Sequence, residues 1–259
     1  MNQTSKSAIT ALAISFVFVA CNNEEKKAEP SSADSTQATT PKTDTTMQNP
    51  DLDATKVAPG LYTVAKDTMG IRVLNVLYKP GDSSAMHSHP DNVLYVIEGG
   101  KTEFTGKDGS KQVLDFKPGF SAIGGSETHS VKNIGKTTVK AILIEVNRPN
   151  SAATTLDPKM DATKVSPNLY KLLADSLNIR LLMATYKPGA SSAMHFHPDN
   201  VIYVISGTKA EFTGKDGTKQ TMDMNDGMIA VMPSATHSVK NVGNKTTKVL
   251  VVEINRPQK

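Results

Sequence analysis

Short runs of β-branched and aromatic residues, separated by turns rich in Gly and Pro, recur along most of the chain after residue 50. Residues 93–97 (VLYVI) and 201–205 (VIYVI) have the length and composition of strands. Residues 101–106 and 111–116 flank Lys107-Asp108-Gly109, whose Asp-Gly pair is typical of a hairpin turn. Many short strands of this kind predict an all-β protein built as a barrel or jelly roll.

Further strands are predicted over residues 138–146 and 247–254, and Lys79-Pro80-Gly81 and Lys187-Pro188-Gly189 indicate turns. Residues 169–177 are ambiguous, because their four leucines have the spacing of a helix face. We predict a strand there, since the corresponding residues 61–70 lack that pattern.

The chain contains a duplicated unit. Residues 51–149 recur at residues 159–257 with a constant offset of 108, and 57 of the 99 aligned positions are identical. A unit of this length is a small domain and not a solenoid repeat. Two tandem domains are therefore predicted, at 51–149 and 159–259, joined by the connector 150–158.

The N-terminus resembles a bacterial lipoprotein signal. Lys6 precedes an apolar run over residues 8–20, which is too short to span a bilayer but suits a secretory signal. Phe18-Val19-Ala20-Cys21 resembles a lipobox, which implies cleavage before Cys21 and lipidation of its thiol. We expect a signal peptide over residues 1–20; the alternative is an ordinary cysteine in an uncleaved leader.

Residues 21–50 are predicted to be a disordered tether, because alanines and one methionine are almost their only apolar residues after the cysteine. The expected location is the cell envelope, with the chain anchored in a membrane by lipid. Asn22 replaces the Asp that retains some lipoproteins in the inner membrane. The outer membrane is therefore favoured, on its periplasmic or surface side.

Composition argues for a soluble globular protein and against a nucleic-acid partner. Hydrophobic residues make up 38% of the chain, and the net charge is only +4. The lysines are interspersed with acids, Trp is absent and aromatic residues are 5%, whereas nucleic-acid binding usually needs clustered basic residues with stacking aromatics.

All the histidines of the chain fall at three positions of the repeat, so each unit has the same three. His-x-His on a strand places both rings on one side of the sheet, and a third histidine follows 40 residues later. Three neutral imidazoles suit a divalent transition metal and leave coordination positions open. We predict two metal ions per chain, against the alternative of buried core histidines or a site that has lost its metal. The predicted ligands are His87, His89, His129, His195, His197 and His237.

These histidines and their neighbours resemble the two motifs of the cupin family. The resemblance covers both repeats and implies two tandem double-stranded β-helix barrels, known together as a bicupin. It implies Fe(II) as the favoured metal, with Zn, Mn, Ni or Cu as alternatives. The matching residues are Gly81, His87, His89 and Gly100, then Gly119, His129 and Asn133, and in the second repeat Gly189, His195, His197, Gly207, Gly227, Pro233, His237 and Asn241.

The sequence departs from the family at its glutamate ligand, where Val93 and Val201 stand. The implied sites therefore have three histidines each, with the valines as possible pocket walls. Tyr95 and Tyr203 are possible pocket residues too, although packing in the core is the simpler interpretation. Asp91 and Asp199 follow His-Pro, which favours a turn over a role as ligand or base.

Three functions remain open. The resemblance favours a mononuclear metal-dependent oxygenase, such as a three-histidine dioxygenase, acting on a small organic anion. The first alternative is an envelope protein that binds a metal or small ligand without catalysis. The second is a sugar isomerase or epimerase, which usually needs an acid–base partner at the metal, and the sequence shows no clear carboxylate for it. The oligomeric state is not predicted.

Overall fold

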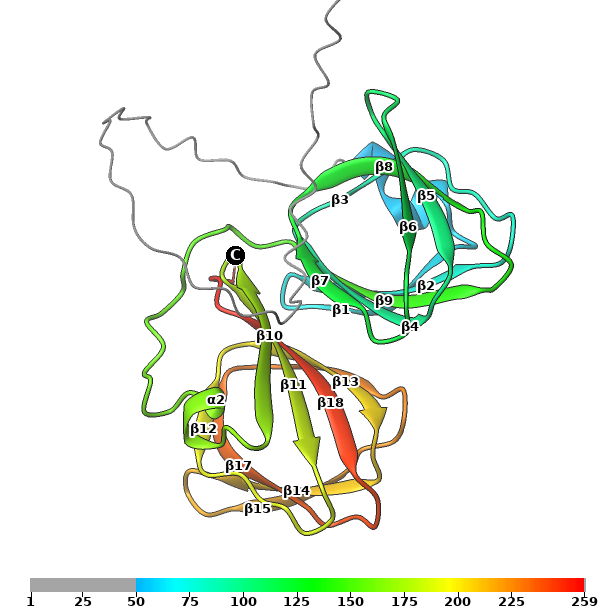
Figure 1. Ribbon diagram of the computed structural model, residues 1–259. Coiled ribbons are helices and arrows are strands. Elements are labelled where there is room, and N and C mark those ends of the chain that lie inside the picture. Colours follow the sequence, from blue (N-terminus) through cyan, green and yellow to red (C-terminus); the bar gives the residue numbers. More distant parts are fainter. Residues whose placement is uncertain (1–49, 259) are drawn as a thin grey trace, which may run out of the picture.

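The computed structural model describes residues 50–258, which form two β-barrels side by side (Figure 1). The predicted signal peptide, Cys21 and nearly all of the predicted tether lie outside the described residues. Within residues 50–258, no helix is long and apolar enough to cross a membrane.

The first barrel consists of two antiparallel sheets, with strand orders β1-β2-β9-β4-β7 and β3-β8-β5-β6. Two short helical turns precede it. The elements are η1 Pro50–Leu52, α1 Ala54–Val57, β1 Tyr62–Thr68, β2 Ile71–Tyr78, β3 His87–His89, β4 Asn92–Glu98, β5 Lys101–Gly106, β6 Lys111–Asp115, β7 Ser121–Gly124, β8 Glu127–Asn133 and β9 Val139–Val146.

The second barrel repeats this topology, with strand orders β10-β11-β18-β13-β16 and β12-β17-β14-β15. The all-β prediction of two tandem jelly-roll barrels is confirmed. The elements are α2 Ala162–Val165, β10 Tyr170–Ser176, β11 Ile179–Tyr186, β12 His195–His197, β13 Asn200–Ser206, β14 Lys209–Gly214, β15 Lys219–Asp223, β16 Ile229–Met232, β17 Ala235–Asn241 and β18 Thr247–Ile254.

The hairpin and the ambiguous leucine segment both follow the predictions. Strands β5 and β6 pair directly, and Gly109 in their turn has a φ of 79°, which glycine adopts without strain. The leucine segment is strand β10, with a bulge between Leu172 and Ala174. Because a bulge inserts one extra residue, it shifts the alternation of side chains and so imitates helical spacing.

The five-stranded sheets are buried on both sides, which explains their nearly continuous apolar runs. In the first barrel, Leu74 and Leu143 pack in the barrel interior. Val73, Val93 and Ile144 alternate with them and belong to one core cluster shared by both barrels. The two barrels therefore pack together through the outer sides of these sheets.

Two reciprocal ion pairs complete the interface between the barrels. Arg148 Nη1 lies 2.9 Å from Asp199 Oδ2, and Arg256 Nη2 lies 2.7 Å from Asp91 Oδ2. Each guanidinium also donates to the other arginine's carbonyl oxygen, at 3.0 and 3.3 Å. Both arginine side chains are fully buried, so this is a fixed connection between the domains.

Candidate metal centre

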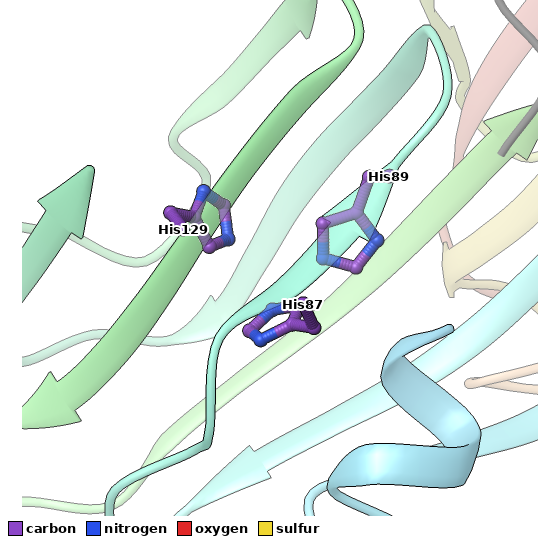
Figure 2. A group of neighbouring side chains, drawn as sticks. All are labelled: His87, His89 and His129. Atoms are coloured by element: carbon purple, nitrogen blue, oxygen red, sulfur yellow. The ribbon is translucent and has the colours of Figure 1, made fainter. Parts of the chain in front are cut away.

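The three histidines of the first barrel converge on one point. His87 and His89 lie on β3, and His129 lies on the neighbouring strand β8, directly opposite His87. Figure 2 shows the three rings turned toward one another. Ring centroids are 4.8 to 5.4 Å apart, and one ligand nitrogen from each ring lies within 4.8 Å of the others.

The second barrel repeats this arrangement. His195 lies opposite His237, and the ring centroids of its three histidines are 4.8 to 5.4 Å apart. Antiparallel pairing of a three-residue strand with the strand of the third histidine brings all three together in each barrel. The predicted ligands are therefore assembled in two groups, each of which can hold a metal ion.

Hydrogen bonds fix which ring nitrogen points to the centre. His87 donates from Nδ1 to the carbonyl of Ala85 at 2.8 Å, and His89 donates from Nδ1 to Glu145 at 2.7 Å. His195 and His197 bond in the same way to Ala193 and Glu253. Since Nδ1 carries the proton in each case, Nε2 keeps the lone pair that a metal requires.

A buried charge network lies behind each His-x-His pair. Glu145 Oε2 accepts from Arg72 Nε at 2.6 Å, and Arg72 Nη1 bonds to Asp53 at 2.6 Å. Although burial opposes it, hydrogen bonds to Asp53 and Glu145 raise the pKa of Arg72. Two carboxylates and one guanidinium leave a net charge of −1 beside the site. Glu253, Arg180 and Asp161 repeat the network in the second barrel.

Neutralising these glutamates should weaken metal binding. In a Glu145→Gln, Glu253→Gln double variant, each side chain keeps its size and an acceptor but loses the negative charge that polarises its histidine. Partners of this kind typically contribute 10- to 100-fold in metal affinity, so we expect a loss of about that order. A chelator-competition titration with Zn²⁺ measures it. Glu98→Gln, which changes an exposed ion pair, is the control. Equal Zn²⁺ affinities in the control and the double variant would contradict a role of Glu145 and Glu253 in metal binding.

Three of the histidines are suited to bind metal at neutral pH because their lowered pKa values keep them uncharged. Burial, with the nearby His89 and His129, lowers the pKa of His87 to about 3. Burial and the adjacent His197 lower the pKa of His195 to about 4, and burial with both neighbours lowers the pKa of His237 to about 3. Two groups of three imidazoles, in which hydrogen bonds orient the His-x-His pair, fit two divalent transition-metal ions.

These pKa shifts predict acid sensitivity of the metal-free protein. The pKa values of His87, His195 and His237 are near 6.5 in the unfolded chain and about 3 to 4 in the folded one, so the unfolded state binds more protons in between. Their stabilisation is complete above about pH 6.5 and is lost as the pH falls toward 4. Urea midpoints of chelator-treated protein at pH 7, 6 and 5 should fall steadily. The triple variant His87→Gln, His195→Gln, His237→Gln should show a smaller fall in urea midpoint over the same pH range. An equal fall would contradict the assignment of the acid sensitivity to these histidines.

Two buried tyrosines per site escaped the sequence analysis. Tyr62 lies with its hydroxyl 3.1 Å from His87 Nε2, and Tyr78 donates to Tyr62 at 2.9 Å. Burial raises the pKa of Tyr62 well above 10 and that of Tyr78 to about 12, so both phenols stay protonated. Tyr170 and Tyr186 repeat the pair beside His195. These tyrosines occupy matching positions in the two repeats, which is a sequence signal for a shared role. The signal is weak, because 57 of the 99 aligned positions are identical.

A cavity opens beside the histidines in each barrel, and it corrects the predicted pocket residues. From β4, Asn92, Leu94 and Val96 line the first cavity. Val93 and Tyr95 alternate with them and point to the opposite side of the sheet. The corresponding Val201 and Tyr203 do the same in the second barrel, and the rings of Tyr95 and Tyr203 pack against each other with centroids 5.6 Å apart. The valines suggested as pocket walls belong instead to the interface core, and the tyrosines pack in that same core, which agrees with the simpler interpretation given for them.

The aspartates after His-Pro line neither histidine cavity and lie at the interface between the barrels. Asp91 accepts from the backbone N–H of Ser126 at 2.9 Å and from Arg256 of the other barrel. Asp199 does the same with Ser234 and Arg148. The favoured turn interpretation holds locally, but the arginine partners 51 and 165 residues away could not be read from the turn sequence.

One carboxylate does reach a cavity, contrary to the sequence analysis. Glu127 lines the first cavity, and its Oε2 lies 3.4 Å from His129 Nδ1, out of line for a hydrogen bond. Ala235 occupies the corresponding position in the second barrel. The two sites therefore share their histidines but differ in the groups around them.

Comparison with known proteins agrees with this architecture. Residues 182–253 match the model of the cupin domain. Among solved structures, AerE from Microcystis aeruginosa is similar with a TM-score of 0.53 and 16% identity, over 74% of this chain and 91% of that one. Oxalate decarboxylase from Bacillus subtilis is similar with a TM-score of 0.53 and 17% identity, over 73% of this chain and 70% of that one. No curated protein matches the chain.

Proposed function

The chain has the bicupin architecture, two tandem cupin barrels, and on that premise we propose that it is a metal-dependent oxygenase acting on a small organic anion. The observation that supports this most is the pair of three-histidine groups. Neither has a carboxylate at the family's ligand position, so a bound metal keeps positions open for other ligands. Fe(II) is the favoured metal, and it would supply one-electron chemistry with O₂.

An anionic ligand is favoured by the charge of the metal and its open coordination positions. In the second barrel a divalent ion brings +2 and the buried network of Glu253, Arg180 and Asp161 brings −1, which leaves about +1 at the centre. In the first barrel Glu127 brings a further −1, so the total there is about zero. The cavities, of ≈ 70 and ≈ 90 Å³, have room for several water-sized groups and hence for a small organic molecule. By its name, the neighbouring oxalate decarboxylase acts on a ligand of this class.

Elemental analysis of protein purified without added metal, combined with an oxygen-electrode screen of small organic acids, tests the proposal. We expect iron and substrate-dependent O₂ uptake, and no uptake by the His89→Ala, His197→Ala double variant. Zinc in the native protein, with no O₂ uptake for any acid, would favour the alternative of a non-catalytic binding protein.

The second part of the proposal is a lipid anchor at Cys21 in the cell envelope, with the outer membrane favoured. The support is the sequence pattern alone, since these residues lie outside the described part of the chain. Cys21→Ser removes the thiol that would be acylated, and it should move the protein from the membrane fraction to the soluble fraction. Asn22→Gln keeps the thiol and is the matched control. Membrane retention of the serine variant would contradict the anchor.

A further inference from the structure

The walls of the two cavities differ in polarity at matched positions. The first cavity is lined by Thr102 and Glu127, whereas the repeat offset places Ala210 and Ala235 at those positions in the second. In the reverse direction, Thr247 lines the second cavity where Val139 lines the first, so the threonine hydroxyls balance and the Glu127 carboxylate is the difference.

The second cavity has gained flexible apolar side chains instead. Met222, Met224 and Met232 line it, at positions that hold Leu114, Phe116 and Gly124 in the first barrel. Methionine adapts its shape to an apolar ligand through three rotatable bonds and a polarisable sulfur. This cavity is also the larger, at ≈ 90 Å³ against ≈ 70 Å³.

The carboxylate of Glu127 is available to a ligand in the first cavity. Its side chain lines that cavity and is 24% exposed, and its Oε2 approaches His129 Nδ1 at 3.4 Å without forming a hydrogen bond. A carboxylate accepts hydrogen bonds and donates none, so it can pair with a donor group on a ligand.

We propose that Glu127 gives the two barrels different ligands. The first barrel takes an organic anion that also carries a hydroxyl or ammonium donor, and the second takes an anion with an alkyl tail. The inference rests on the proposed function, in which each metal site binds the anionic group. Glu127 then meets the far end of the ligand in barrel one, and the methionines meet it in barrel two.

The ligand preference of each cavity follows from the kind of ligand that its lining residues disfavour. A plain alkyl tail in the first cavity would cover the Glu127 carboxylate without a hydrogen-bond partner, which is costly. A donor group on the ligand removes that penalty. No carboxylate lines the second cavity, so the same donor would lose water there without gaining an ionic partner, while the methionines favour an alkyl tail. Each cavity therefore discriminates against the ligand of the other.

Isothermal titration of Zn²⁺-loaded protein with butanoate and 4-hydroxybutanoate tests this, because the two acids differ only in a hydroxyl remote from the carboxylate. The His197→Ala variant reports on the first site alone, and His89→Ala reports on the second. We expect the first site to prefer 4-hydroxybutanoate by about tenfold, and the second to prefer butanoate. Zinc stoichiometry of one per chain verifies that each variant keeps its remaining site.

Exchanging the side chains should exchange the preference. In the His197→Ala background, Glu127→Ala should remove the preference for the hydroxy acid, while Glu127→Gln, which keeps an acceptor, should retain part of it. In the His89→Ala background, Ala235→Glu at an exposed position should confer the preference on the second site. The same ratio of affinities at both sites would overturn the inference and leave the proposed function intact. Absence of binding by either acid at either site would overturn both.

Discussion

Replacing His89 with alanine should lower the metal content from two ions per chain to one. His89 is 3% exposed, its Nδ1 is held by Glu145, and its free nitrogen lies within 4.8 Å of those of His87 and His129. Two imidazoles alone leave a divalent ion with a much weaker site. Elemental analysis after dialysis against a weak chelator measures the loss, and the intact second barrel is an internal control.

The same substitution in both barrels should remove all metal. The His89→Ala, His197→Ala variant should contain no bound ion and show no rise in melting temperature when Zn²⁺ is added. The parent protein should gain stability, by about 2.7 kcal/mol for each occupied site when the free ion is at 100 times its dissociation constant. One ion per chain in the parent, or metal retained by the double variant, would contradict the two-site arrangement.

Most of the fold and the metal ligands could be predicted because the relevant signals are local or repeated. Strand β4 is a β-branched and aromatic run, and the β5–β6 turn has Asp-Gly chemistry, so both are evident from neighbouring residues. The ligands were evident because His87, His89 and His129 recur with the same offset as the domain itself. An internal repeat thus provides a comparison of two related sites within one chain.

The residues that line the pockets could not be predicted, because a shift of one residue along a strand moves the side chain to the other side of the sheet. The family glutamate was assigned to Val93, whereas its two neighbours, Asn92 and Leu94, line the cavity. In a strand with one polar side the error would be obvious. In β4 both sides are apolar, since one packs in the barrel and the other on the second barrel, and the pattern contains no marker of direction.

The interface charges were also beyond sequence reasoning, because their partners are distant in the chain. Asp91 and Arg256 are 165 residues apart, and each lies in a segment that suggests an ordinary exposed turn or terminus. Only the packing of one five-stranded sheet on the other brings them together and excludes water from them. The consequence is a buried ion pair whose removal has a large predicted effect.

Arg256→Met should be strongly destabilising. It leaves the Asp91 carboxylate, in a residue only 4% exposed, without its arginine, and it removes the hydrogen bond from Arg256 Nε to the carbonyl of Leu177. Removing one partner of a buried pair typically costs about 3–5 kcal/mol, because the remaining charge is uncompensated. For a folded unit of this size that lowers the melting temperature by roughly 10 °C. Thermal denaturation followed by circular dichroism measures it.

Two further variants test whether Arg256→Met is destabilising because it leaves the Asp91 charge uncompensated, or only because a basic side chain is lost. Adding Asp91→Asn to Arg256→Met removes the uncompensated charge, so the double variant should recover part of the lost stability. Lys140→Met breaks the exposed pair with Glu98, in which both side chains are about half exposed, and should change the melting temperature little. If Arg256→Met and Lys140→Met had equal effects, or if Asp91→Asn gave no recovery, the reciprocal ion pairs would not be what fixes one barrel to the other.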